Sequence, residues 1–149
     1  MMKRNEILLA GKKIAIFVMM LLLAGNFAYA KNIKGLLHSK TTLEPIIIGA
    51  GKALADKPYK LEAGKYYKLI LKSDGSREIP IVGASFFRNI WVNQISINDI
   101  EVRPLGIDSF EFDDEGEIEL TFVPIKPGTY TLGLPSAKSD RERAIFIVE

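Results

Sequence analysis

The segment FVPIKPGTYTLGLPSAKSDRERAIFIVE, residues Phe122 to Glu149, decides the fold class. Two strand-like runs, TYTL and RAIFIVE, flank a polar loop, and a Lys-Pro-Gly sequence precedes the first of them. Alternation of apolar residues with a period of two is typical of strands, and Pro followed by Gly is typical of a tight turn. The segment therefore predicts strands joined by a turn and a charged loop, with no helix.

Strand-like runs of the same kind continue upstream of this segment. They are LEPIIIG, YKLEAGKYYKLILKSDG, REIPIVG, NIWVNQISI, IEVRP, FEFDD and GEIELTFVP. Gly, Pro and Asp turns separate them, and no convincing amphipathic helix or internal repeat interrupts them. The pattern predicts an all-β chain folded as one antiparallel, Greek-key β-sandwich with a barrel-like shape, over residues 44–149.

The N-terminus has the three-part pattern of a signal peptide. Basic residues precede an apolar run of 11 residues, Ile14 to Ala24, and Ala28-Tyr29-Ala30 forms a small-x-small cleavage site. The run is shorter than the ~20 residues of a membrane-spanning helix. We predict a signal peptide over residues 1–30, cleaved after Ala30, and then a flexible arm over residues 31–43. Retention of the signal as an anchor is the alternative.

Removal of residues 1–30 changes the composition of the chain. The remaining 119 residues carry 16 Lys and Arg and 17 Asp and Glu, so the net charge falls from +2 to −1. This balance gives no electrostatic reason to bind nucleic acid or an anionic membrane surface. The chain has no Cys, and its four Met residues leave with the signal. A periplasmic or secreted domain of this composition is held by its core alone, without disulfides.

FVPIKPGTYTL resembles the end of a cupredoxin domain, where a strand, a Lys-Pro-Gly turn and a Tyr-led strand deliver the copper loop. LEAGKYYKLILKSDG resembles the earlier strand pair of that family, in which a Gly turn precedes a strand of alternating apolar residues. The resemblance covers the chain from about Leu43 to Glu149. It implies a cupredoxin-like fold for the β-domain of residues 44–149.

The copper ligands of the cupredoxin family are missing at the corresponding positions. An ungapped count from Tyr130 puts the family's Cys, His and Met ligands at Leu134, Ala137 and Glu142. The remaining family His would lie in or near SREIPIVGASFFRNI, which has none. A type 1 copper centre needs a thiolate, two imidazoles and usually a weak axial thioether. We therefore expect the fold without its copper site, and no cofactor.

Acidic residues and one histidine are the remaining candidates for a metal site. In FEFDDEGEIELTF we predict a hairpin whose turn contains Asp114, Glu115 and Gly116. Its polar face would carry Glu111, Asp113, Glu117 and Glu119. Such a face could bind a hard cation such as calcium or a basic partner, or serve as a solvated surface that discourages edge aggregation. His38 is a single imidazole in the predicted arm.

The segment SFFRNIWVNQ supplies the candidates for partner binding, namely Phe86, Phe87, Arg88 and Trp91. Aromatic residues beside an arginine are typical of interface hot spots. The competing interpretation is that these large side chains close the core of a small sandwich.

Nothing in the sequence resembles a catalytic constellation, because a nucleophilic Ser or Thr needs an adjacent base and the single His is in the arm. We therefore expect no enzyme activity. The predicted function is that of an exported interaction or accessory module for a periplasmic redox or transport system, with a periplasmic protein partner. The alternative is a metal-handling or electron-transfer protein of the cupredoxin family that binds copper or a hard cation through non-standard ligands.

Overall fold

The structure is a computed structural model that describes residue 37 and residues 39–149. The predicted signal peptide, most of the predicted arm and His38 lie outside the described residues. Among the residues described, no helix is long and apolar enough to cross a membrane.

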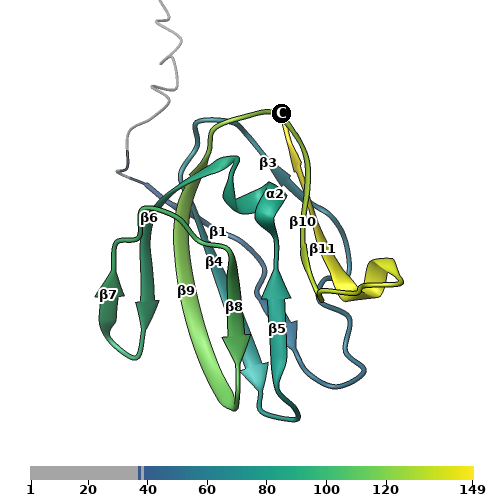
Figure 1. The fold of residues 1–149 in the computed structure, drawn as a ribbon. Helices are drawn as coiled ribbons and strands as arrows, with labels where there is room; N and C mark the ends of the chain where they lie inside the picture. Colours follow the sequence, from purple (N-terminus) through teal and green to yellow (C-terminus); the bar gives the residue numbers. More distant parts are fainter. Residues whose placement is uncertain (1–36, 38) are drawn as a thin grey trace, which may run out of the picture. The chain divides into compact units, whose positions relative to one another are not determined.

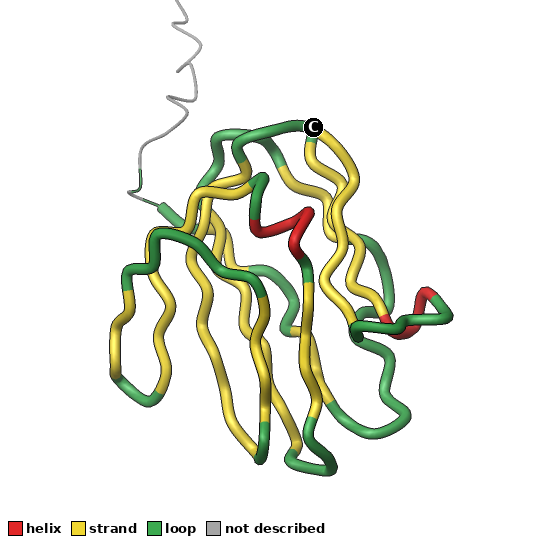
Figure 2. Tube along the Cα trace, in the orientation of Figure 1, coloured by secondary structure: helices red, strands yellow, loops and turns green. Residues whose placement is uncertain are grey.

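Two β-sheets face each other and form a sandwich (Figures 1 and 2). The first sheet has the strand order β1-β4-β9-β6-β7, and β2 pairs with β4 beside β1. Its strands are β1 (Thr41–Thr42), β2 (Ile46–Ile48), β4 (Tyr67–Asp74), β6 (Ile90–Ile97), β7 (Ile100–Val102) and β9 (Glu115–Pro124). The long strand β9 lies at its centre and pairs in antiparallel fashion with both β4 and β6.

The second sheet has the order β3-β11-β10-β5-β8. Its strands are β3 (Tyr59–Leu61), β5 (Ile79–Val82), β8 (Ser109–Phe112), β10 (Gly128–Gly133) and β11 (Arg143–Val148). The strands β10 and β11 pair from Gly128↔Val148 to Gly133↔Arg143. The segment that opened the sequence analysis therefore supplies the two neighbouring strands at the middle of this sheet.

The predicted fold class is confirmed, since the described residues form a two-sheet β-sandwich with little helix. Strand β4 shows why the pattern was informative, because Tyr67, Leu69 and Leu71 are buried while the residues between them are partly exposed. One edge of each sheet differs from the purely antiparallel expectation: β1 and β2 run parallel to β4, and β3 runs parallel to β11. The predicted arm also differs, because residues 41–42 form β1.

The predicted acidic hairpin is wrong. Strand β8 pairs with β5 in the second sheet, whereas β9 pairs with β4 and β6 in the first, so the chain crosses from one sheet to the other at residues 113–114. The alternation itself was correct, since Phe112, Ile118 and Leu120 are buried. A period of two fixes which side chains face the core, but it does not fix which strand is the partner.

Aromatic side chains from both sheets meet around the short helix α2 (Ala84–Phe87). The Phe86 ring is fully buried, with its centroid 4.3 Å from that of Phe146 on β11 and 5.4 Å from that of Phe122 on β9. Phe87 packs against Phe86 and against Phe110 on β8. The two phenylalanine rings of the helix therefore contact strands of both sheets and join them.

The Lys-Pro-Gly turn before β10 is fixed by the tyrosine that follows it. The Tyr130 hydroxyl donates to the carbonyl oxygens of Lys126 at 3.1 Å and Pro127 at 3.2 Å. Gly128 has φ +152°, a backbone conformation that residues other than glycine rarely adopt. A Cβ atom added at this position would lie 2.8 Å from the Tyr130 hydroxyl oxygen. The tyrosine thus clamps the turn that directs β10 along β11.

Candidate functional site

The loop between β10 and β11 contains the three positions to which the sequence count assigned the copper ligands. Leu134 is partly buried and packs against the hydrophobic core, and its backbone N–H donates to the Glu142 carbonyl at 3.1 Å. The Ala137 N–H in turn donates to the Leu134 carbonyl at 3.1 Å. The Arg143 guanidinium donates to the Ala137 carbonyl. The loop is therefore held together by hydrogen bonds between its own backbone groups and by one hydrogen bond from Arg143.

Glu142 has a defined role within this loop. It ends the 3₁₀ helix η1 (Asp140–Glu142), and its carboxylate accepts hydrogen bonds from the N–H groups of Lys138 at 2.6 Å and Ser139 at 3.3 Å. The hydrogen bond from the Lys138 N–H lowers the pKa of Glu142, partial desolvation opposes this, and the Ser139 N–H and nearby positive charges add to the decrease. The only carboxylate at the three ligand positions is thus already hydrogen-bonded as a cap.

Positive charge surrounds the hollow beside the loop. This hollow has a volume of about 250 Å³ and is bordered by Leu134 and Glu142 on the loop and by Lys52, Arg77 and Arg141. Three basic side chains and one acid, Glu142, border the hollow, and Lys52 is paired with Asp74 at 2.7 Å, so the border keeps a small excess of positive charge that disfavours a cation.

The residues present do not fit a type 1 copper centre. Such a centre requires a thiolate and two imidazoles, yet the chain contains no cysteine and one histidine. Leu134 and Ala137 have side chains without donor atoms, and the Glu142 carboxylate caps its own loop. No step of electron transfer can be built on these positions.

The predicted partner-binding segment contains two buried residues and two exposed ones. The Phe86 and Phe87 side chains are buried at 0% and 6% exposure, so these two residues pack the core and cannot contact a partner. This corrects their assignment as partner-binding candidates. Arg88, at the end of α2, is exposed, and Trp91 on β6 keeps 48% of its surface exposed. Ile125 is also exposed and its N–H donates to the Asn89 carbonyl, which places it beside this segment.

The acidic candidates also divide, because β8 and β9 belong to different sheets. Glu111 and Asp113 lie with Glu78, and one carboxylate oxygen from each falls within 4.8 Å of the others at an exposed site. A hydrogen bond with the Glu78 carboxyl raises the pKa of Glu111, and desolvation and the charges of Glu78 and Asp113 act in the same direction. The sequence analysis missed Glu78, whose proximity results from the pairing of β5 with β8.

Glu119 and Glu117 are separate from that group. The Glu119 carboxylate forms ion pairs with Lys68 at 2.8 Å and with Lys40 at 3.4 Å. Partial burial by itself raises the pKa of Glu119, but the hydrogen bonds and charges of the two lysines outweigh it and lower the pKa overall. Glu117 pairs with Lys72 of β4 in the strand register. These acids are therefore balanced by lysines rather than gathered as ligands.

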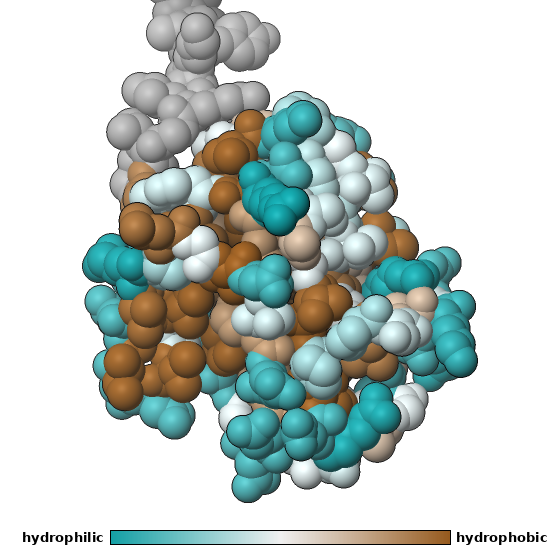
Figure 3. Space-filling view, in the orientation of Figure 1, coloured by the Kyte–Doolittle hydropathy of each residue, from teal (hydrophilic) through white to brown (hydrophobic). Residues whose placement is uncertain are grey.

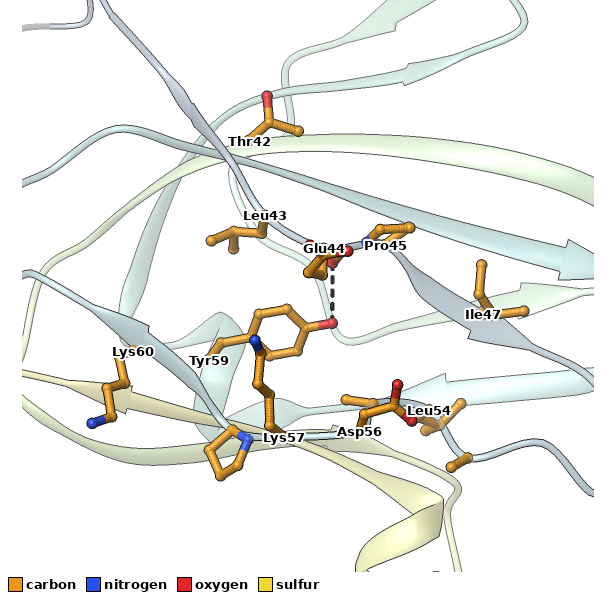
Figure 4. Close-up of a pocket in the computed structure, with 13 residues that line it drawn as sticks. Thr42, Leu43, Glu44, Pro45, Ile47, Leu54, Asp56, Lys57, Tyr59 and Lys60 are labelled. Atoms are coloured by element: carbon orange, nitrogen blue, oxygen red, sulfur yellow. Dashed lines mark hydrogen bonds between the residues drawn. The ribbon is translucent and has the colours of Figure 1, made fainter.

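A groove of about 900 Å³ lies between the Thr42–Ile47 stretch and the Ala53–Lys60 stretch (Figure 4). It borders the edge strands of both sheets. Inside it, the Tyr59 hydroxyl donates to the Glu44 carbonyl at 3.0 Å. Burial first, and then the charges of Glu44 and Asp56, raise the pKa of Tyr59 to about 12. Tyr59 therefore stays protonated at neutral pH and joins the two sheet edges instead of serving as a base.

Exposed apolar side chains gather on the hairpin of β6 and β7, as Figure 3 shows on the left of the molecule. They are Ile97, Ile100 and Val102, and the nearby Leu105 is also fully exposed. The sequence analysis predicted both strands but could not indicate this exposure, which arises because β7 ends the sheet.

Comparison with known proteins identifies a fold class. A multicopper oxidase from Pseudomonas thermotolerans superposes with a TM-score of 0.54 at 15% identity, covering 74% of this chain and 30% of the oxidase. A second multicopper oxidase gives a TM-score of 0.49 at 10% identity, covering 62% of this chain and 32% of its own. A copper nitrite reductase from Nitrosomonas europaea gives 0.49 at 9% identity, covering 67% and 35%. The first of these superpositions shows that the chain has the predicted cupredoxin-like fold.

The sequence comparisons add nothing to this, since no family model and no curated protein matches the chain. The chain spans about 30% of the length of the Pseudomonas thermotolerans oxidase. The prediction that the chain is not an enzyme is contradicted, because the multicopper oxidase that shares its fold is an enzyme. That prediction was based on the absence of a recognisable catalytic constellation, and such an absence does not exclude an enzyme.

Proposed function

We propose that this chain is an exported cupredoxin-like module that carries no type 1 copper and works through contact with a protein partner in a periplasmic redox or transport system. The observation that carries the proposal is the loop between β10 and β11. The three positions that the sequence count assigned to copper ligands hold a partly buried leucine, an alanine and a capping carboxylate. The N-terminal sequence pattern, of basic residues, an apolar run and Ala28-Tyr29-Ala30, supports export.

The surface around Arg88 supports the choice of a protein partner. Arg88, Trp91 and Ile125 are exposed together, next to the end of α2, and combine an aromatic ring, a guanidinium and an aliphatic side chain. Trp and Arg are the residue types that contribute most to interface hot spots. Because α2 is fixed by its buried phenylalanines, this surface is held on a rigid support.

Metal analysis tests the first part of the proposal. The protein is purified from its native compartment without chelators, and its metal content and visible spectrum are measured. We expect substoichiometric copper and no blue colour. Stoichiometric copper with an intense blue absorption would overturn the proposal and favour an electron-transfer protein with non-standard ligands.

Binding measurements test the second part. Partners are trapped by crosslinking in the native compartment, and the purified partner is titrated with the protein and with its Trp91→Ala and Arg88→Ala variants. Each variant should weaken binding by tenfold or more, or about 1.4 kcal/mol, as expected for a hot-spot residue. Arg77→Ala, an exposed arginine before the start of β5, is the matched control. Equal affinities for all variants would show that the partner binds elsewhere.

A further inference from the structure

Strand β7 is an open sheet edge with an apolar inner face. It ends the first sheet, and all three of its residues are exposed. Val102 pairs with Ile95, which belongs to the core, so Val102 lies on the inner face of the sheet. Ile100, opposite Ile97, lies on the same face. Val102 and Ile100 are nevertheless 43% and 65% exposed, so a large part of each side chain is not covered by the second sheet.

The turn between β6 and β7 shows which backbone groups are free at this edge. Asn98 and Asp99 form a two-residue turn with φ values of 46° and 64°, and two positive φ values are the signature of a type I′ hairpin. In such a turn the flanking residues, Ile97 and Ile100, form a hydrogen-bonded pair. Because hydrogen-bonded pairs alternate along an antiparallel ladder, the backbone groups of Ile100 and Val102 face β6. Those of Glu101 face the open edge, and so would those of Arg103 in a strand prolonged by one residue past Val102.

The charges on this edge select one antiparallel register for a second identical strand. Only residues that face outward can form the new hydrogen-bonded pairs, so a two-fold antiparallel pairing must be centred on Glu101, on Val102 or on Arg103. The register centred on Glu101 opposes two carboxylates, and the register centred on Arg103 opposes two guanidinium groups. The register that places Glu101 opposite Arg103 opposes unlike charges twice, and Val102 then lies opposite its own copy on the two-fold axis.

Pro104 is compatible with the same register. It lies outside β7, two residues after Val102, so the N–H that it lacks is not one of the Glu101 and Arg103 donors that the register uses. The edge therefore keeps every donor that the paired register uses. Within one copy the Glu101 and Arg103 side chains already lie side by side, 3.7 Å apart, which shows that both project from the outer face of the strand.

We propose that two copies of this chain associate through antiparallel pairing of β7 with β7, with Val102 on the two-fold axis and Glu101 of each copy opposite Arg103 of the other. The paired strands extend the first sheet across both copies and bring the exposed Val102 and Ile100 side chains together on its inner face. The proposal does not rest on the proposed function, because it uses neither the ligand loop nor the surface around Arg88. The interface is short, so the dimer is weak and forms at high local concentration.

Charge exchange tests the register. The intact protein is examined by sedimentation velocity from about 1 μM to about 1 mM, the range of affinities expected for a small interface. We expect concentration-dependent dimers that are lost in Glu101→Arg and in Arg103→Glu, where like charges oppose. The double variant Glu101→Arg/Arg103→Glu restores unlike charges across the axis and should restore the dimer. Glu62→Arg, which removes the partner of Lys65 elsewhere on the surface, is the control.

A single cysteine tests the position of the axis. The chain has no cysteine, so Val102→Cys introduces the only thiol, and the Val102 pair is a non-hydrogen-bonded pair whose Cα atoms lie close enough for a disulfide. Mild oxidation should give a covalent dimer rapidly in this variant and slowly in Ile125→Cys, which is exposed away from β7. Thermal melting of each variant shows that it is folded.

A protein that stays monomeric at every concentration would overturn the proposal. The exposed face of β7 would then be available to bind a different protein. Dimers that survive both single charge reversals, or equal crosslinking rates for the two cysteine variants, would also overturn it. Either result leaves the copper and partner measurements above unaffected, so the two proposals fail separately.

Discussion

At the scale of the residue, Tyr130 explains why the sequence KPGTY was informative. Its ring is buried, and its hydroxyl holds the carbonyls of the turn that it follows. Sequence reasoning identified the turn and the strand but not the bond between them, since a pattern of residue types does not show where a hydroxyl points. The copper-ligand positions were assigned by counting from Tyr130, a residue that these hydrogen bonds hold against the turn.

Tyr130→Phe removes the hydroxyl and leaves the ring. The carbonyls of Lys126 and Pro127 lose a donor, so the free energy of unfolding should fall by about 1 kcal/mol with the fold unchanged. Urea denaturation measures the change, and the slope of the transition should stay the same. An unchanged midpoint would show that water replaces the hydroxyl without loss.

Glu111→Gln should stabilise the protein at neutral pH. In the folded state a hydrogen bond with Glu78, with desolvation and the charges of Glu78 and Asp113, raises the pKa of Glu111 above its ordinary value of 4.5. A raised carboxyl pKa contributes stability that is present below the unfolded pKa and is lost as the pH rises through the folded pKa. Glutamine does not ionise, so the variant avoids this loss.

The melting temperature, measured at pH 7 and at pH 4, checks this expectation. The variant should melt above the parent at pH 7, and the difference should shrink at pH 4. Asp108→Asn, an exposed acid before β8, controls for the change in net charge. A variant that melts lower at pH 7 would mean that the three acids are held together by a favourable interaction.

At the scale of the element, the period of two located nearly every strand, and turn residues located most of their ends. Partners were harder to predict than strands. The runs on either side of Asp114 were predicted to pair because they are adjacent in sequence, but they belong to different sheets. Short elements such as β1 and α2 were missed, because two to four residues are too few to show a period and are fixed by their tertiary neighbours.

The loop between β10 and β11 gives a prediction at this scale. Glu142→Ala removes the acceptor of the Lys138 and Ser139 N–H groups, so the backbone of the loop should open more often. Hydrogen exchange should accelerate at these two amides while the amides of β10 and β11 keep their protection. Asp140→Ala, in the same 3₁₀ helix, is the control. Equal exchange in the parent and in Glu142→Ala would mean that η1 is stable without its cap.

At the scale of the whole molecule, the sequence predicted a sandwich but not the contacts between segments that are far apart in the chain. The groove around Tyr59, the acidic group that includes Glu78 and the contact between Phe86 and both sheets each depend on segments far apart in the chain. Hydrophobic pattern shows that a side chain is buried but not which other segment buries it. For the same reason Phe86 and Trp91 looked equivalent in sequence, although one is in the core and the other is exposed.

Phe86→Ala should weaken both sheets together. The ring touches Phe122 in the first sheet and Phe146 in the second, so truncation leaves a cavity at their junction and should cost about 3–5 kcal/mol. Urea unfolding followed by tryptophan fluorescence, which reports on the first sheet, and by circular dichroism should show one coincident transition at a lower midpoint. Ile125→Ala, at an exposed site, should change the midpoint little. Two separate transitions would show that the sheets are joined by other contacts.

The parallel pairing of β3 with β11 affects how the protein matures. Strand β3 has its partner in β11, which the ribosome makes much later, so the second sheet cannot be completed before β11 is made. Contacts of such long sequence separation form slowly, because the entropy of closing the chain is lost before the contacts form. Until then, β3 lacks its partner and β10 lacks one of its two partners.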